Sequence, residues 1–246
     1  MDDPIRYLNK QLKVIAKCSQ KLAQKTSPMT VHKTRVAIRR ARVALSLLNS
    51  DSHSELKHLS RDLLRLRRRL DQIGDLDVAI GNAPLFSINP KRLISIRKHA
   101  AHELRHKLKT EKHMNFSKRI VKAGYLLRKP GQDDSYPVLR LMLASLGDRA
   151  SNDERFGRKA SHQLRIVMKH ARYTLEASNR PIQEMKPLQD ILGQAHDIQV
   201  LRDLVGNKSR MKAAQKGLNL KARPLIGPTI KYAIRELKLL MPFEHR

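Results

Sequence analysis

Apolar side chains recur every three or four residues along almost the whole chain. In the first segment they fall at Ile5, Leu8, Leu12, Ile15 and Leu22. Because an α-helix has about 3.6 residues per turn, this spacing puts the apolar residues on one helical face. No segment shows sustained alternation of apolar and polar residues, so strands are not expected. The pattern predicts an all-α protein.

Turn-forming residues divide this pattern into about eight helices. The first three are expected to end near residues 26, 50 and 80, and the later ones to span about 91–128, 137–147, 154–178 and 183–204. The last stretch is expected to be interrupted at Gly227-Pro228, because proline removes a backbone donor. The short connections favour antiparallel neighbours that pack as helical bundles.

The sequence contains an internal repeat. Residues 31–45 return as residues 161–175, and both segments place a histidine, an arginine three residues later, a base four further on and an arginine three beyond that. A weaker echo pairs residues 74–78 with residues 196–200. We therefore predict two copies of one four-helix unit within a single domain of residues 1–246. The two halves would be 1–129 and 136–246, joined by a linker rich in polar residues, proline and glycine.

The composition adds a strong positive charge. Across 246 residues, 51 Lys and Arg face 22 Asp and Glu, which gives a formal net charge of +29. A polyanionic ligand would relieve the resulting self-repulsion. No run of 18 apolar residues occurs and the start is acidic, so neither a membrane span nor a secretory signal is expected. A single cysteine excludes internal disulfides. We expect a folded cytoplasmic protein with an anionic partner.

Two predicted helices carry a basic face beside an apolar face. The first basic stripe consists of His32, Arg35, Arg39 and Arg42, next to a core face of Thr34, Ile38, Ala41 and Leu45. The second basic stripe consists of His162, Arg165, Lys169 and Arg172, next to a core face of Leu164, Met168, Ala171 and Leu175. Neighbouring residues are rotated by about 100° on a helix, which separates the two faces. Like charges one turn apart destabilise a helix, so their duplication indicates a function.

A third basic stripe follows on the next helix, at Lys57, Arg61, Arg65 and Arg68. The planar guanidinium of arginine matches phosphate oxygens and stays charged at any relevant pH. A single basic stripe is more often a solvated helix face, on which the aliphatic parts of the Lys and Arg side chains cover the edge of the core. The duplication of a stripe together with its histidine favours contact with phosphate.

These motifs resemble the CHAD family, the conserved histidine α-helical domain. The segment His32-x-x-Arg35-Val-Ala-x-Arg39-Arg40-x-Arg42 looks like the first family signature, and His162-x-x-Arg165 through Arg172-Tyr173-x-x-Glu176 looks like the second. Leu188-Gln189-Asp190-Ile191-Leu192-Gly193 followed by Asp197 is similar to a later family motif. The resemblance spans almost the whole chain. One departure is Gly74, where the family usually has arginine.

The resemblance implies two four-helix bundles related by a pseudo-twofold axis, with inorganic polyphosphate bound in a basic channel between them. Some family members localise to polyphosphate granules. The function implied is binding without catalysis, with no cofactor and no metal; protein partners are not indicated. The expected polyphosphate-binding residues are His32, Arg35, Arg39, Arg40, Arg42, Arg61, Arg65, Arg68, His162, Arg165, Lys169 and Arg172.

A metal site is one alternative. The segment His102-Glu103-Leu104-Arg105-His106 has the spacing that places two histidines on one helical face beside a glutamate. Four basic neighbours, Arg97, Lys98, Arg105 and Lys107, would repel a divalent cation. A solvated helix face is therefore favoured over zinc binding.

Two further alternatives are a phosphohydrolase and a nucleic-acid-binding protein. Phosphoryl transfer requires metal-bound carboxylates, and Asp75-x-Asp77 is the one compact acidic pair inside a helical pattern. The other interpretation is that Asp75 and Asp197 orient neighbouring arginines. The E-x-E-x-K signature of the CYTH tunnel phosphatases is missing. Nucleic acid would be attracted non-specifically by charge, but few aromatic residues are present for base stacking.

Overall fold

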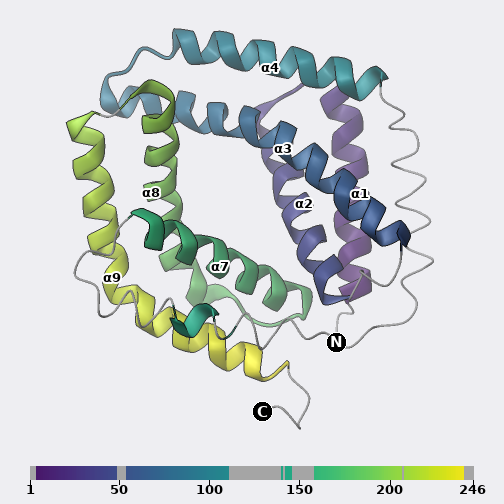
Figure 1. The fold of residues 1–246 in the computed structure, drawn as a ribbon, viewed down its shortest axis with the longest axis vertical. Coiled ribbons are helices and arrows are strands. Elements are labelled where there is room, and N and C mark those ends of the chain that lie inside the picture. The colour runs from purple at the N-terminus through teal and green to yellow at the C-terminus, as the bar shows by residue number, and fades with distance from the viewer. Residues whose placement is uncertain are drawn as a thin grey trace. The chain divides into compact units, whose positions relative to one another are not determined.

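The computed structural model describes residues 4–48, 54–110, 140, 142–145, 158–206 and 208–240. In this part of the chain every regular element is a helix, which confirms the all-α prediction (Figure 1). Contacts between Cα atoms divide the chain into two compact units, residues 2–133 and 134–246. Each unit has its own apolar core. The duplication of one bundle stays a prediction.

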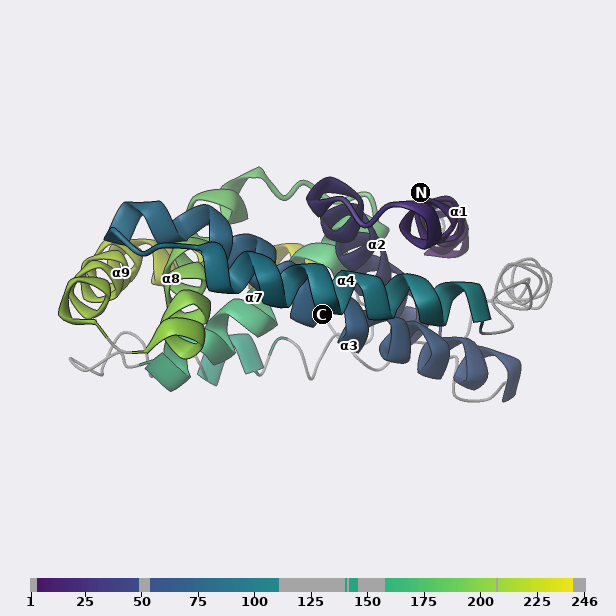
Figure 2. The same ribbon diagram turned by 90° about the horizontal axis from the view of Figure 1, so that it is seen from above.

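The N-terminal unit is built from four long helices. They are α1 (Pro4–Gln24), α2 (Pro28–Leu47), α3 (Ser54–Asn82) and α4 (Lys91–Thr110), with a 3-10 turn, η2 (Ala83–Phe86), between the last two. Helix α1 packs on α2 and α4, and α3 packs on the same two helices. Figures 1 and 2 both show α1 and α2 side by side. Helix α4 confirms the predicted helix of residues 91–128 as far as Thr110, and the rest of that prediction lies outside the described residues.

Local signals in the sequence set the helix boundaries of this unit. Ser27 caps α2, since its side chain accepts a hydrogen bond from the backbone N–H of Thr30 at 3.2 Å, and Pro28 occupies the first turn. Arg97 of α4 donates to a carboxylate oxygen of Asp77 on α3 at 2.7 Å and to the carbonyl of Thr26 at 2.9 Å. This ion pair fixes α4 to α3 and to the turn that precedes α2.

The C-terminal unit is built around three long helices. They are α7 (Arg158–Ala177), α8 (Lys186–Val205) and α9 (Ser209–Lys238), with a 3-10 turn, η3 (Gln183–Met185), before α8. All three long helices pack on one another. Leu143, in the short helical segment 142–145, is fully buried in the same core. The predicted linker and most of the predicted helix 137–147 lie outside the described residues.

The expected interruption at Gly227-Pro228 is wrong. Helix α9 continues through Pro224 and Pro228, and Figure 1 shows it bending part-way along its length. Both prolines are exposed, whereas Ile226 and Ile230 are buried in the core. An interior proline costs a helix about 3 kcal/mol, and burial of the apolar face on both sides of the bend offsets that cost. Among the described helices, none is long and apolar enough to cross a membrane.

Candidate anion-binding site

The core faces of α2 and α7 lie where the sequence predicts them. Thr34, Ile38 and Ala41 on α2 have no exposed surface, and the corresponding residues of α7 are equally buried. The cations one position away are half-buried at the edge of each core, including Arg35, Arg39 and Arg40 on α2, and Arg165 and Lys169 on α7. The aliphatic parts of these side chains pack against the protein. Binding an anion would therefore cost little further side-chain entropy.

Arg35 is held in place by two carboxylates of α3. Its Nε donates to Asp71 Oδ1 at 2.9 Å and its Nη2 donates to Asp75 Oδ1 at 2.8 Å. The side chain is only 13% exposed. Asp75 therefore orients a neighbouring arginine, which confirms that interpretation of this aspartate. Asp71 also lies 3.8 Å from Arg39 Nη2 and accepts a hydrogen bond from Arg67 Nε at 3.1 Å.

Sequence reasoning missed Asp71 and Arg67. The available signal was spacing, because Asp71 precedes Asp75 by one helical turn and therefore shares its face. Arg67 is one of three consecutive arginines, at positions 67–69, and the sequence alone does not show which of them contacts Asp71.

Gly74 gives Arg35 the space that it occupies. A Cβ atom built at Gly74 would lie 1.8 Å from Arg35 Nη1 and 2.8 Å from its Cδ, closer than side-chain atoms approach one another. This contact explains locally why position 74 is glycine rather than the arginine usual in the family. Any larger residue would displace the Arg35 guanidinium from Asp71 and Asp75.

Arg42 carries the least compensated charge of the first basic stripe. Burial lowers the pKa of its guanidinium, and the nearby positive charge of Arg67 lowers it further. Its Nε is buried and makes no hydrogen bond to any described residue. Arginine nevertheless stays protonated in proteins, so the charge persists. A half-buried cation beside a second cation would be stabilised by a nearby anion.

The third basic stripe is a solvated surface. Arg61, Arg65 and Arg68 are exposed. Arg65 Nη1 lies 3.4 Å from Asp62 Oδ1, and Arg61 Nε donates to the carbonyl of Lys57 in its own helix, also at 3.4 Å. Exposed pairs of this kind contribute little to stability, so these side chains are easily redirected to a ligand. His32 is also exposed on α2.

The second basic stripe is anchored at its C-terminal end. Arg172 Nη1 donates to Gln189 Oε1 of α8 at 2.7 Å, and Gln189 in turn donates to the carbonyl of Met168 at 3.0 Å. Arg172 Nε lies 3.3 Å from Glu176 Oε1, and the guanidinium lies 4.9 Å from the ring centre of Tyr173. Arg172 therefore packs α8 on α7, much as Arg35 packs α3 on α2.

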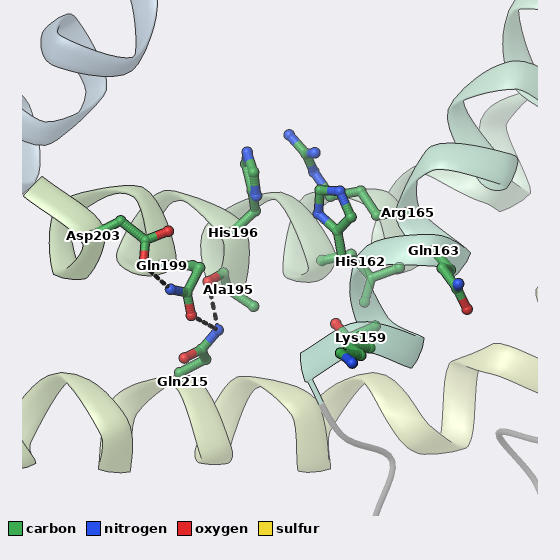
Figure 3. Close-up of a pocket in the computed structure, with 11 residues that line it drawn as sticks. Lys159, His162, Gln163, Arg165, Ala195, His196, Gln199, Asp203 and Gln215 are labelled. Atoms are coloured by element: carbon green, nitrogen blue, oxygen red, sulfur yellow. Dashed lines mark hydrogen bonds between the residues drawn. The ribbon is translucent and has the colours of Figure 1, made fainter. Parts of the chain in front are cut away.

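A pocket of about 320 Å³ opens at the other end of the second basic stripe. Its lining comes from three helices and includes His162 and Arg165 of α7, His196 of α8 and Gln215 of α9. The His162 and His196 rings are tilted, with centroids 5.6 Å apart. Figure 3 shows both rings and the Arg165 side chain extending to the same side, away from α9. Sequence reasoning noted His196 only within the weak echo of residues 74–78 and did not assign it to a site.

The floor of this pocket is a hydrogen-bonded amide network. Gln215 Nε2 donates to Gln199 Oε1 at 3.3 Å and to the carbonyl of Ala195 at 3.4 Å, while Gln199 Nε2 donates to Asp203 Oδ1 at 2.6 Å (Figure 3). Arg202 also donates to both glutamines. These interactions occupy the amide groups of both glutamines.

The suggested metal motif on α4 lies on an exposed face. His102 and His106 are exposed, and Glu103 lies 3.3 Å from the ring of His99. Within the described ranges, three or more His, Cys, Asp or Glu residues are nowhere close enough together to hold a metal ion.

The sequence model of the CHAD domain matches residues 6–206, which is most of the chain. This chain belongs to the CHAD domain family. No curated protein matches it. Among solved structures, it is similar to the CHAD domain from the plant Ricinus communis, with a TM-score of 0.63 and 20% identity over 96% of this chain and 91% of that one. It is also similar to PptA from Streptomyces chartreusis, with a TM-score of 0.57 and 13% identity over 96% and 98%. At these identities both similarities show the fold alone.

Proposed function

We propose that this CHAD protein binds inorganic polyphosphate without transforming it, through the basic stripes of α2 and α7. The observation that carries the proposal is the duplicated row of half-buried cations along the edge of each core, with Arg42 uncompensated beside Arg67. Residues three and four apart on a helix are separated by a rise of about 4.5–6 Å, so each stripe presents a linear array of charges. A linear polyanion matches such an array.

The carboxylates support binding rather than catalysis. Asp75 and Asp77 form the compact acidic pair that a phosphohydrolase would need, yet Asp75 accepts from Arg35 at 2.8 Å and Asp77 accepts from Arg97 at 2.7 Å. Asp71 meets three arginines. Carboxylates committed to guanidinium groups are poor ligands for the metal ions that phosphoryl transfer uses. We therefore propose a non-catalytic role.

The family resemblance supports two wider parts of this proposal. The first is that the stripes of both units contribute to one basic channel. The second is that the protein acts in the cytoplasm and recruits other proteins to polyphosphate granules. Polyphosphate bound in such a channel would hold the protein on the granule. Recruitment of other proteins therefore depends on polyphosphate binding.

A competition experiment tests the ligand class. Labelled long-chain polyphosphate bound to the protein is challenged, at about 0.15 M salt, with unlabelled polyphosphate or with duplex DNA of equal total charge. We expect polyphosphate to compete at least tenfold better, because a flexible strand can follow a narrow channel and a stiff duplex cannot. Affinity should also fall steeply with salt, as counterion release requires. Equal competition by DNA would instead identify a non-specific nucleic-acid-binding surface.

A further inference from the structure

We propose that Arg42 of α2 and Arg67 of α3 form a two-arginine phosphate site in the N-terminal unit, and that Asp71 is the positioning residue that holds Arg67 there. The ligand is a phosphoryl group, either part of a polyphosphate chain or free inorganic phosphate. This inference rests on the proposed function for its ligand class. It adds to that function Arg67, which belongs to none of the three basic stripes, and a difference between the two units.

The guanidinium of Arg42 has no compensating partner. The side chain is half-buried at the edge of the core and its Nε is buried, yet no hydrogen bond or ion pair joins the guanidinium to any described residue. Burial lowers its pKa, and the neighbouring charge of Arg67 lowers that pKa further. Because arginine stays protonated in proteins, the positive charge persists and a bound anion would offset it.

One carboxylate fixes the position of Arg67. Arg67 Nε donates to Asp71 Oδ2 at 3.1 Å, one turn further along α3. The other oxygen of Asp71 accepts from Arg35 Nε at 2.9 Å, which anchors the carboxylate to α2. Asp71 engages the Nε of Arg67, and the Nη groups of Arg67 make no hydrogen bond to any described residue. These Nη groups are donors that match the oxygens of a phosphate.

The two units differ at the positions of this site. The repeat of residues 31–45 in residues 161–175 aligns α2 with α7, and the echo of residues 74–78 in residues 196–200 aligns α3 with α8. Because each aligned segment belongs to a continuous helix, the same registers extend to the site residues. They pair Arg42 with Arg172, Arg67 with Gln189 and Asp71 with Gly193.

The equivalent arginine of the C-terminal unit has a neutral and an acidic partner. Arg172 Nη1 donates to Gln189 Oε1 at 2.7 Å, and Arg172 Nε lies 3.3 Å from Glu176 Oε1. In the N-terminal unit, Arg67 replaces the glutamine and the uncharged Ser46 replaces the glutamate. A guanidinium cannot accept a hydrogen bond. The N-terminal unit therefore has two like charges where the C-terminal unit has a hydrogen bond, and an anion would bridge them.

The site is reached from solvent and adjoins the first basic stripe. The side chains of Arg67 and Asp71 are 34% and 28% exposed. Arg39, a member of that stripe, has its Nη2 3.8 Å from Asp71 Oδ1. A phosphate bound by Arg42 and Arg67 would therefore lie beside a stripe that can bind the next phosphates of a chain.

Arg67→Gln tests the site, because it gives Arg42 the neutral partner that Arg172 has. Without ligand, we expect the urea midpoint to be unchanged or higher, since the repulsion between Arg42 and Arg67 is removed. The affinity for tripolyphosphate should fall at least about tenfold, since a charge-assisted contact is lost. Urea unfolding of the whole protein measures the first effect, and calorimetric titration at about 0.15 M salt measures the second.

Arg92→Gln is the matched control, because it removes the same charge from an exposed position on α4. Its affinity for tripolyphosphate should fall less than about threefold, since distant surface charges are screened. If both variants lose affinity equally, binding depends on total charge and the two-arginine site is overturned.

An NMR titration locates the ligand. The guanidinium nitrogen resonances are assigned with Arg42→Lys, Arg67→Gln and Arg92→Gln. We expect tripolyphosphate to shift the resonances of Arg42 and Arg67 and to leave that of Arg92 in place. Orthophosphate is titrated separately. A shift with orthophosphate as well identifies a site for free phosphate, and a shift with tripolyphosphate alone identifies a site for phosphates within a chain. Either result supports the two-arginine site.

The remaining outcomes separate this inference from the proposed function. An unchanged affinity of Arg67→Gln, an unmoved Arg42 resonance, or a loss of stability together with the loss of affinity overturns the two-arginine site. If long-chain polyphosphate still outcompetes DNA in that case, the proposed function stands without it. If Arg67→Gln behaves as expected but long-chain polyphosphate binds no better than DNA, the two-arginine site stands and the proposed function fails.

Discussion

Replacing Arg39, Arg165 and Lys169 together by glutamine is expected to weaken binding of long-chain polyphosphate by at least about 100-fold. All three cations are half-buried beside the core faces of α2 and α7. Charge-assisted hydrogen bonds contribute roughly 1.5–3 kcal/mol each, and three of them lost would exceed the roughly 2.7 kcal/mol that corresponds to this factor. Arg35 and Arg172 stay unchanged, because each forms ion pairs within its own unit, Arg35 with Asp71 and Asp75 and Arg172 with Glu176. Calorimetric titration at about 0.15 M salt measures the change.

A matched triple variant controls for net charge. Arg92→Gln, Lys98→Gln and Arg210→Gln remove two arginines and one lysine from exposed positions on α4 and α9. We expect this variant to lose less than about threefold in affinity, since distant surface charges are screened within about 8 Å at that salt concentration. Equal losses in both variants would show that binding depends on total charge rather than on the basic stripes. The exposed arginines Arg61, Arg65 and Arg68 would then be tested next.

Gly74→Ala is expected to destabilise the N-terminal unit by about 2 kcal/mol, although alanine is the better helix former by about 1 kcal/mol. The added Cβ would lie 1.8 Å from Arg35 Nη1, so the guanidinium must leave its position between Asp71 and Asp75. Arg35 is 13% exposed, so moving its guanidinium away from both aspartates costs more than the helix gains. Urea unfolding measures the free-energy difference.

Gly193→Ala is the matched control, because Gly193 also lies inside a helix and a Cβ there would meet nothing within 4 Å. This change should stabilise the protein by about 0.5–1 kcal/mol. A double-mutant cycle then isolates the contact: in an Arg35→Ala background, Gly74→Ala should become stabilising as well. If Gly74→Ala destabilises the protein equally with and without Arg35, the space beside this glycine serves something other than the guanidinium.

The helical periodicity was sufficient to predict the fold class and the core faces. Ile38 on α2 and Met168 on α7 fall on faces read directly from residue spacing, and both are fully buried. Spacing succeeds here because helix geometry fixes which residues share a face. The turn signal failed at Gly227-Pro228, since the packing that keeps α9 continuous comes from residues distant in sequence.

The candidate site was only partly predictable. Spacing placed Arg35 and Arg42 on one stripe, yet the structure holds Arg35 between two aspartates and leaves Arg42 Nε without a hydrogen bond to any described residue. That difference depends on α3, including the absence of a side chain at Gly74, and no local pattern on α2 shows it. The histidine pocket was missed for the same reason, because His162 and His196 meet across two helices.

A crystal structure with bound short-chain polyphosphate tests the central claim most directly. We expect phosphate oxygens within about 2.7–3.2 Å of side-chain nitrogens on both basic stripes, at Arg39 and Arg42 of α2 and at Arg165 and Lys169 of α7. Polyphosphate bound instead along the exposed outer face of α3, or along α4, with neither stripe contacted, would contradict it.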